Sequence, residues 1–414
     1  MAKPASNTKK RAHALFNWFD QRLPISEFWD KHLAGYYAPK NFNFWYFFGS
    51  LAMLILVLQI VTGIFLTMHY KPSAEEAFGS VEYIMRDVDW GWLIRYMHTT
   101  GASAFFIVIY LHMFRGLLYG SYRKPRELIW IFGMIIYVLL MAEAFMGYVL
   151  PWGQMSYWGA QVIISLFGAI PKFGGVITEW IRGDYFISDA TLNRFFALHV
   201  IAVPIMLLLL VVLHLSALHQ VGSNNPDGIE IKDYKGSDGK PIDGIPFHPY
   251  YTVKDIFGVG VFLFIFAFII FFAPEMGGLF LEHDNFVPAD PLVTPVHIKP
   301  VWYFTPYYAI LRAIPDKLGG VIMMFAAIVM LFLLPWLDRS RVKSIRYKGW
   351  ISKLLLAIFA VTFIRLGMLG MAEGTPAETL ESRIWTFIYF AFFGLLWFFS
   401  KYENTKPVPE RVSK

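Results

Sequence analysis

The sequence predicts an all-α integral membrane protein with eight transmembrane helices. Of its 414 residues, 57% are hydrophobic and only 16% are charged, which is outside the range of ordinary soluble domains. Apolar segments of about 20 residues, enough to cross ~30 Å of hydrocarbon as a helix, recur eight times. They cover residues 44–68, 91–119, 129–150, 192–218, 253–273, 318–337, 350–370 and 384–400. Eight such segments in one chain argue against buried helices of a soluble core.

The distribution of lysine and arginine predicts that both termini are cytoplasmic. An even number of spans puts the termini on one side, and cytoplasmic segments carry the excess of basic residues. The arm to residue 40, the connection after the second span, residues 339–348 and the tail from Lys401 are basic, whereas the 70–89 connection is mainly acidic. The net charge of +6 follows from this topology and does not indicate a nucleic-acid partner.

The spans and their connections divide the chain into four regions. Residues 1–40 form a cytoplasmic arm, in which "RAHALFNWFDQR" (11–22) fits either a helix on the membrane surface or a solvated leader. Residues 41–220 hold four spans and an outer connection at 151–190. Residues 221–252 form a cytoplasmic connection, and residues 253–414 hold four spans and an outer connection at 274–316. These connections exceed a simple turn, so we expect function there.

Two spans each carry a pair of histidines. His98 and His112 are 14 residues apart, and His199 and His214 are 15 apart. At about 100° per residue each pair returns to within roughly 40–60° of one face, about 21–22 Å apart along the helix. Because the two spans run in the same direction, His98 faces His199 toward the outside and His112 faces His214 toward the cytoplasm. Intramembrane ionisable groups indicate function.

This arrangement of histidines suits two non-covalent haems. Each iron takes one imidazole from either helix, whereas zinc needs more ligands or an open position with water. The chain contains no cysteine, which excludes disulfides, Cys-ligated clusters and covalently attached haem within it.

Glycines and arginines accompany the histidines. Four glycines repeat the 14-residue spacing on the first and third spans: Gly49, Gly63, Gly133 and Gly147. A glycine lets a macrocycle approach the helix backbone closely, although helix–helix packing also explains small residues. Three arginines stand near the helix ends: Arg95, Arg115 and Arg194. They can hydrogen-bond haem propionates, or they are only snorkelling residues.

The chain resembles the cytochrome b family of cytochrome bc1 complexes over nearly its whole length. The resemblance is carried by "GWLIRYMHTTGAS" (91–103), "FMGYVLPWGQMSYWGA" (145–160), "FFALH" (195–199), "GSNNP" (222–226), "HPYYTVKD" (248–255), "TPVHIKPVWYF" (294–304) and "YAILRAIPDKLGG" (308–320). It implies a four-helix bundle holding two haem b groups, in the membrane subunit of a quinol–cytochrome c reductase. It also implies a Rieske iron–sulfur protein and cytochrome c1 as partners, a homodimeric assembly, and the bacterial inner membrane as location.

The resemblance implies two quinone sites. The outer site, for quinol oxidation, is assigned to Phe145, Met146, Tyr148, Gly159, Pro300, Val301, Trp302, Tyr303 and Tyr308. The inner site, for reduction of a quinone such as ubiquinone, is assigned to His219, Lys254 and Asp255. Asp255 also fits a charge at a helix N-terminus.

The sequence departs from the family at Val301. The usual Pro-Glu-Trp-Tyr reads "PVWY", and valine cannot accept a proton. We hypothesise that Glu275 or Glu143 takes up the quinol proton, and we favour Glu275 because it borders the same connection. The 15-residue spacing of His199 and His214 leaves the tilt of the inner haem open.

The implied function is transmembrane electron transfer. Quinol oxidised at the outer site passes one electron to the iron–sulfur partner and the other through the two haems to quinone. Two alternatives are a dihaem anchor of another quinone-linked dehydrogenase, which needs no second quinone pocket, and an ion-coupled transporter with intramembrane His and Glu relays.

Overall fold

The computed structural model describes residues 14, 16–29 and 35–412. Within them, eight helical segments are long and apolar enough to cross a membrane, which confirms the predicted spans. These segments are Phe44–Thr67, Gly91–Tyr119, Glu127–Val149, Asp189–Val221, Phe247–Phe272, Lys317–Leu337, Trp350–Met371 and Pro376–Tyr402. The predicted surface helix lies partly outside the described residues. Its described part is helical over residues 16–20 and exposes Phe16, Trp18 and Phe19.

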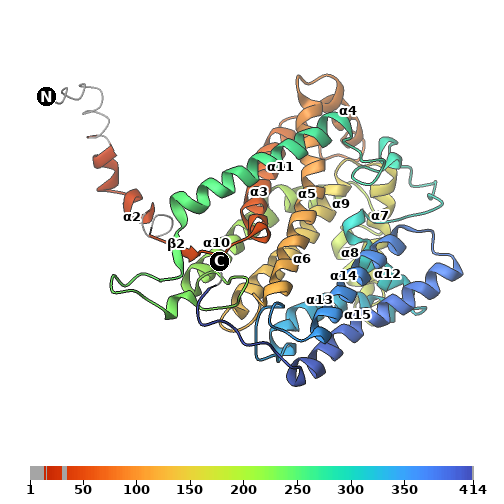
Figure 1. The fold of residues 1–414 in the computed structure, drawn as a ribbon. Coiled ribbons are helices and arrows are strands. Elements are labelled where there is room, and N and C mark those ends of the chain that lie inside the picture. The colour runs from red at the N-terminus through yellow and green to blue at the C-terminus, as the bar shows by residue number, and fades with distance from the viewer. Residues whose placement is uncertain (1–13, 15, 30–34, 413–414) are drawn as a thin grey trace.

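The α-helices follow one another along the chain as shown in Figure 1. They are α2 (Ile25–Trp29), α3 (Phe47–Thr67), α4 (Ala77–Arg86), α5 (Gly91–Tyr119), α6 (Glu127–Val149), α7 (Gln154–Phe167), α8 (Gly174–Arg182), α9 (Asp189–Ala197), α10 (Val203–Val221), α11 (Thr252–Phe272), α12 (Thr305–Ala313), α13 (Lys317–Leu337), α14 (Trp350–Met371) and α15 (Pro376–Tyr402).

The N-terminal half is built from two helix pairs. Helix α3 packs closely on α5, and α6 packs closely on α10. Helix α11 adds to the first pair, and the C-terminal helices α12–α15 pack on one another, with α13 touching α6. In Figure 1 the C-terminal helices, in blue, form a group beside the N-terminal bundle. The first four spans therefore form a bundle of two pairs.

The N-terminal arm, the 221–252 connection and the C-terminal tail meet at one end of the bundle. Strand β1 (Tyr37–Pro39) pairs antiparallel with β2 (Gly244–Pro246), an addition to the predicted all-α fold. The buried Asp243 carboxylate binds Lys40 at 2.8 Å and Arg411 at 2.7 Å. The N-terminal arm, the 221–252 connection and the C-terminal tail are thus joined, as an even number of spans requires. Which side of the membrane this end faces stays a prediction.

The other end of the bundle joins the two long outer connections. The Gly153 backbone forms an isolated antiparallel bridge with Pro288, and the backbone N–H of Ser156 donates to the Asn285 side chain at 2.8 Å. Helices α7 and α8 are 14 and 9 residues long, too short to span a bilayer. The 151–190 and 274–316 connections therefore fold against each other beside the ends of α6 and α7.

Candidate functional site

The structure brings together the histidines that the helical spacing pairs. The ring centroids of His98 and His199 are 6.3 Å apart, and those of His112 and His214 are 6.5 Å apart. His98 and His112 lie on α5, whereas His199 and His214 lie on the span formed by α9 and α10. Each imidazole pair therefore bridges from one closely packed helix pair to the other.

His199 and His214 are separated by one residue more than His98 and His112, and a single turn of π-helix accommodates this residue. This turn, Leu198–Ala202, joins α9 to α10 and contains His199 itself. A π-turn accommodates one residue more than an α-turn and often occurs at functional sites. The 15-residue spacing therefore acts like one of 14, the spacing of His98 and His112 on α5. Pro204, which has no N–H to donate, follows directly at the start of α10.

Each predicted glycine lies against one of the imidazoles. A Cβ atom would stand 3.4 Å from His98 at Gly63, 3.5 Å from His112 at Gly49 and 3.3 Å from His214 at Gly133. At Gly147 it would overlap the His199 ring. Gly63 and Gly147 therefore lie at the level of His98 and His199, and Gly49 and Gly133 at the level of His112 and His214. The missing side chains make room for the histidine rings themselves.

The separation of the imidazoles fits a metal ion held between them. Two imidazoles that held one metal ion between them, each at a metal–nitrogen distance of about 2 Å, would have ring centroids roughly 6 Å apart. The observed 6.3 Å and 6.5 Å meet this requirement. In the part of the chain that the structure describes, no three His, Asp or Glu side chains are grouped for a metal ion. The donors that the two helix pairs bring together are two imidazoles at each level.

Two of the three predicted arginines lie with the histidines. Arg95 lines the same pocket as His98, and its Nη1 atom is buried without a hydrogen-bond partner among the described residues. Arg115 lies 3.5 Å from Nδ1 of His112, and its Nε atom is likewise buried and unpaired in the described structure. Such guanidinium groups suit an anionic ligand such as a propionate. Arg194 is not among them, because it is exposed and donates to the Trp180 carbonyl.

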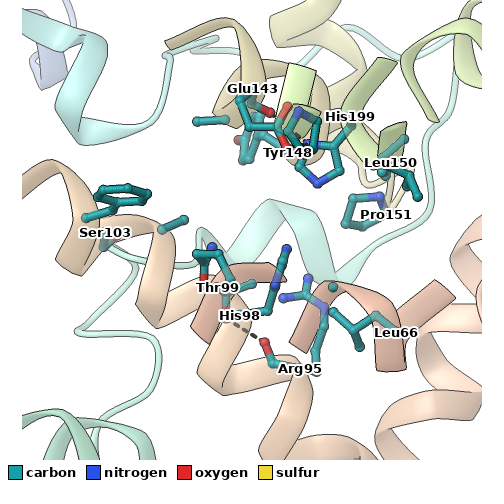
Figure 2. Close-up of a pocket in the computed structure, with 18 of the residues that line it drawn as sticks. Leu66, Arg95, His98, Thr99, Ser103, Glu143, Tyr148, Leu150, Pro151 and His199 are labelled. Atoms are coloured by element: carbon teal, nitrogen blue, oxygen red, sulfur yellow. Dashed lines mark hydrogen bonds and ion pairs between the residues drawn. The ribbon is translucent and has the colours of Figure 1, made fainter. Parts of the chain in front are cut away.

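One pocket contains the outer histidine pair and several residues of the predicted quinol site (Figure 2). His98 and His199 project into it, with Tyr148 and Glu143 beside His199 in this view. Val301 and Tyr303 also line it. The predicted outer haem level and the predicted quinol site are therefore parts of one continuous space.

The remaining outer-site residues form or support this pocket to different degrees. The Tyr303 ring stacks on Phe106 with centroids 3.9 Å apart, and Trp302 donates to the Ser103 hydroxyl at 3.1 Å. Gly159 faces the Tyr148 ring, since a Cβ there would lie 3.9 Å away. Phe145 and Met146 belong to a second apolar cluster. Tyr308 donates to the backbone of Ile298 at 3.3 Å, so it braces the segment that leads to Pro300.

The two carboxylates predicted to accept the quinol proton, Glu143 and Glu275, each lie against a histidine. Glu143 lies 3.0 Å from Nδ1 of His199, which also faces the Glu143 backbone carbonyl at 2.9 Å. Glu275 lies 3.6 Å from Nδ1 of His283, and its side chain is one-third exposed. A carboxylate absent from the prediction, that of Glu282, is buried and accepts a hydrogen bond from Tyr148. The feature of the sequence that could have indicated Glu282 is its position in the 274–316 connection, where function was expected.

The predicted inner-site residues lie at the opposite end of the bundle. The His219 ring packs on Tyr36 with centroids 4.6 Å apart. Asp255 is partly buried in the first turn of α11. Lys254 lies 4.6 Å from the centre of the Tyr250 ring, so its ammonium is directed to an aromatic face.

Comparison with known proteins agrees with this architecture. The family model for cytochrome b/b6/petB matches residues 33–222, and that for cytochrome b(C-terminal)/b6/petD matches residues 288–390. The cytochrome b of Allochromatium vinosum is 64% identical over 405 residues, which cover 96% of this chain and 98% of the relative. The cytochrome b/c1 of Bradyrhizobium diazoefficiens is 48% identical, and the match covers 96% of this chain and 56% of that protein.

A solved structure is also similar. A chain of a hyperthermophilic respiratory complex III aligns with a TM-score of 0.85 and 40% sequence identity, covering 92% of this chain and 97% of that chain. Sequence and fold thus match along nearly the whole length. The protein belongs to the cytochrome b/b6 family, whose members bind haem b.

Proposed function

We propose that this chain is the cytochrome b subunit of a bacterial quinol–cytochrome c oxidoreductase. The observation that carries the proposal is the pair of imidazole levels in one bundle, the outer of which opens into the pocket of Tyr148 and Tyr303. Its similarity to a chain of a respiratory complex III and to a cytochrome b/c1 protein supports partnership with cytochrome c1 and a Rieske iron–sulfur protein in a homodimeric assembly.

The histidines are the ligands of two haem b groups in this proposal. A bound haem supplies reversible one-electron chemistry. Nδ1 of His98 lies 2.9 Å from the Thr62 hydroxyl, and Nδ1 of His199 lies 2.9 Å from the Glu143 carbonyl. These contacts orient both outer rings so that Nε2 is free for iron.

In this proposal one quinone site lies at each end of the bundle. At the outer end, the buried walls formed by Val301 and Tyr303 keep water away from a bound quinol, and the Tyr148 hydroxyl orients it. At the inner end, His219 and Asp255 hydrogen-bond and protonate a quinone such as ubiquinone. Release of protons outside and uptake inside then contribute to a proton gradient.

Spectroscopy and turnover of the purified assembly test this function. We expect quinol-dependent reduction of cytochrome c and two b-type bands in the reduced-minus-oxidised spectrum. His98→Ala removes one band and His112→Ala removes the other, because each loses one iron ligand. The exposed His69 provides a matched control, since His69→Ala leaves both bands in place. A colourless preparation, as an ion-coupled transporter gives, or a single band refutes the proposal.

A further inference from the structure

The outer pocket needs a proton acceptor that Val301 cannot supply. Glu275 does not line this pocket and pairs with the exposed His283. Glu143 lines it, but its carboxylate lies against Nδ1 of His199, where it acts on the ring orientation.

Glu282 is positioned differently. It is 7% exposed and immediately precedes the short turn His283–Phe286. Its carboxylate accepts hydrogen bonds from the Tyr148 hydroxyl and from Nδ2 of Asn285, the latter at 3.3 Å. Tyr148 and Asn285 both line the outer pocket. The carboxylate therefore lies directly behind two pocket-lining side chains.

The hydrogen bonds in this group have a defined direction. Oδ1 of Asn285 accepts from the Ser156 backbone N–H at 2.8 Å, which leaves the amide nitrogen facing Tyr148. That nitrogen donates to the Tyr148 hydroxyl oxygen at 2.9 Å. Because the oxygen already accepts this bond, its own hydrogen is free to point at Glu282. A proton on the pocket side of Tyr148 thus has a connected route to the carboxylate.

The charged and titratable groups around Glu282 come from three segments. Tyr148 approaches from α6, Asp284 from the same connection, and Lys299 and Tyr303 from the segment around Val301. Burial is the largest effect and raises the pKa of Glu282 to about 7, while the Tyr148 hydrogen bond and Lys299 oppose it. A carboxyl group with this property takes up and releases a proton near neutral pH.

We propose that Glu282 accepts one quinol proton through the Tyr148 hydroxyl, in place of an acidic residue at position 301. This rests on the proposed quinol oxidation. The quinol loses two electrons and two protons to become quinone. The electrons pass to the one-electron acceptors named above, an iron–sulfur centre of a partner and the outer haem. For one proton, the quinol O–H breaks as Tyr148 gains it, and the original Tyr148 proton forms the O–H of Glu282. The next residue, His283, is exposed to solvent.

The test compares Glu282→Gln with Glu275→Gln in the whole purified complex. Glu282→Gln is expected to lower the rate of quinol-dependent cytochrome c reduction by about 10²-fold, the lower range for loss of acid–base catalysis. In the wild type the rate falls below about pH 7, because a protonated carboxyl cannot accept a proton. This acidic limb is expected to disappear in Glu282→Gln and to persist in Glu275→Gln, with both haem bands intact.

Further variants separate a chemical role from a structural one. Glu282→Asp keeps a carboxylate, so it is expected to recover part of the rate and to retain an acidic limb at a shifted midpoint. A wild-type rate and pH profile in Glu282→Gln overturns the proposal while leaving quinol oxidation in place. An inactive Glu282→Asp with normal haem bands and no acidic limb also overturns it. A wild-type complex that binds haem but oxidises no quinol refutes both the proposed function and this step.

Discussion

The Thr62 hydroxyl lies 2.9 Å from Nδ1 of His98 and donates its own hydrogen to the Leu58 carbonyl at 2.6 Å. Its oxygen therefore accepts from Nδ1–H of the imidazole, which places the free lone pair of the ring on Nε2. A hydroxyl on α3 thus sets the tautomer of a proposed iron ligand on α5.

Removing this hydroxyl is expected to change one haem only. A hydrogen bond from Nδ1–H makes an imidazole a stronger donor, which favours the oxidised iron. Thr62→Val should therefore raise the midpoint potential of the outer b-type signal and leave the inner one unchanged, as measured by redox titration of the optical bands. Thr67→Val, on the same helix but bonded only to the Ile64 carbonyl, is the control. Equal shifts of both signals would contradict this assignment.

Gly147 is the most restrictive glycine of the four. A methyl group there overlaps the His199 ring, whereas one at Gly79 meets nothing within 4 Å. Overpacking costs about 1–3 kcal/mol, so Gly147→Ala is expected to reduce outer-haem occupancy by about tenfold or more. Pyridine haemochrome analysis per mole of chain measures this. Gly79→Ala should retain both haems, and full occupancy in Gly147→Ala would show that the ring moves aside without loss.

The π-turn predicts which deletions the dihaem bundle tolerates. Deleting the exposed Ile201 converts the turn at Leu198–Ala202 to α-helix and keeps His199 and His214 on one face. Deleting the equally exposed Leu209 leaves the π-turn and rotates His214 by about 100° relative to His199. We expect two b-type bands after the first deletion and loss of the inner band after the second. The same spectrum from both variants would rule out this function of the turn.

Asp243 predicts an acid-sensitive contribution to stability. The Arg411 hydrogen bond, aided by Lys40, holds the pKa of this carboxyl far below its usual range. Its folded-state pKa is depressed, so the stabilisation is complete above the unfolded value of about 4 and decreases as pH falls below it. Asp243→Asn is expected to cost about 1–3 kcal/mol at neutral pH, less than a fully buried pair because both cations are partly exposed.

Thermal unfolding of the solubilised protein at several pH values measures this contribution. The difference between wild type and Asp243→Asn should shrink as the pH is lowered below about 4. The exposed Asp233→Asn serves as the control and should match wild type throughout. A constant difference at every pH would indicate packing of the side chain instead of its charge.

Several parts of the site were predictable because they depend on local geometry. The partner and level of each histidine follow from the helical repeat and the direction of the spans. The same holds for Gly49, Gly63, Gly133 and Gly147. The position of Glu282 was not predictable, because its burial depends on the contact between the 274–316 connection and the ends of α6 and α7. Arg194 was predicted at the histidines and does not lie with them. Its closeness to His199 in sequence does not fix where the guanidinium points, and in the structure it donates to the Trp180 carbonyl.

The sequence by itself determined the eight spans and the facing of the two histidine pairs, because hydropathy and a 3.6-residue period act within each helix. Only the tertiary structure decided the rest. It joined β1 to β2 across some 200 residues of chain, absorbed the extra residue before Pro204 in a π-turn, and buried Glu282 behind Tyr148. The physical reason is that these features depend on contacts between segments distant in the chain, and no local pattern of residues encodes such contacts.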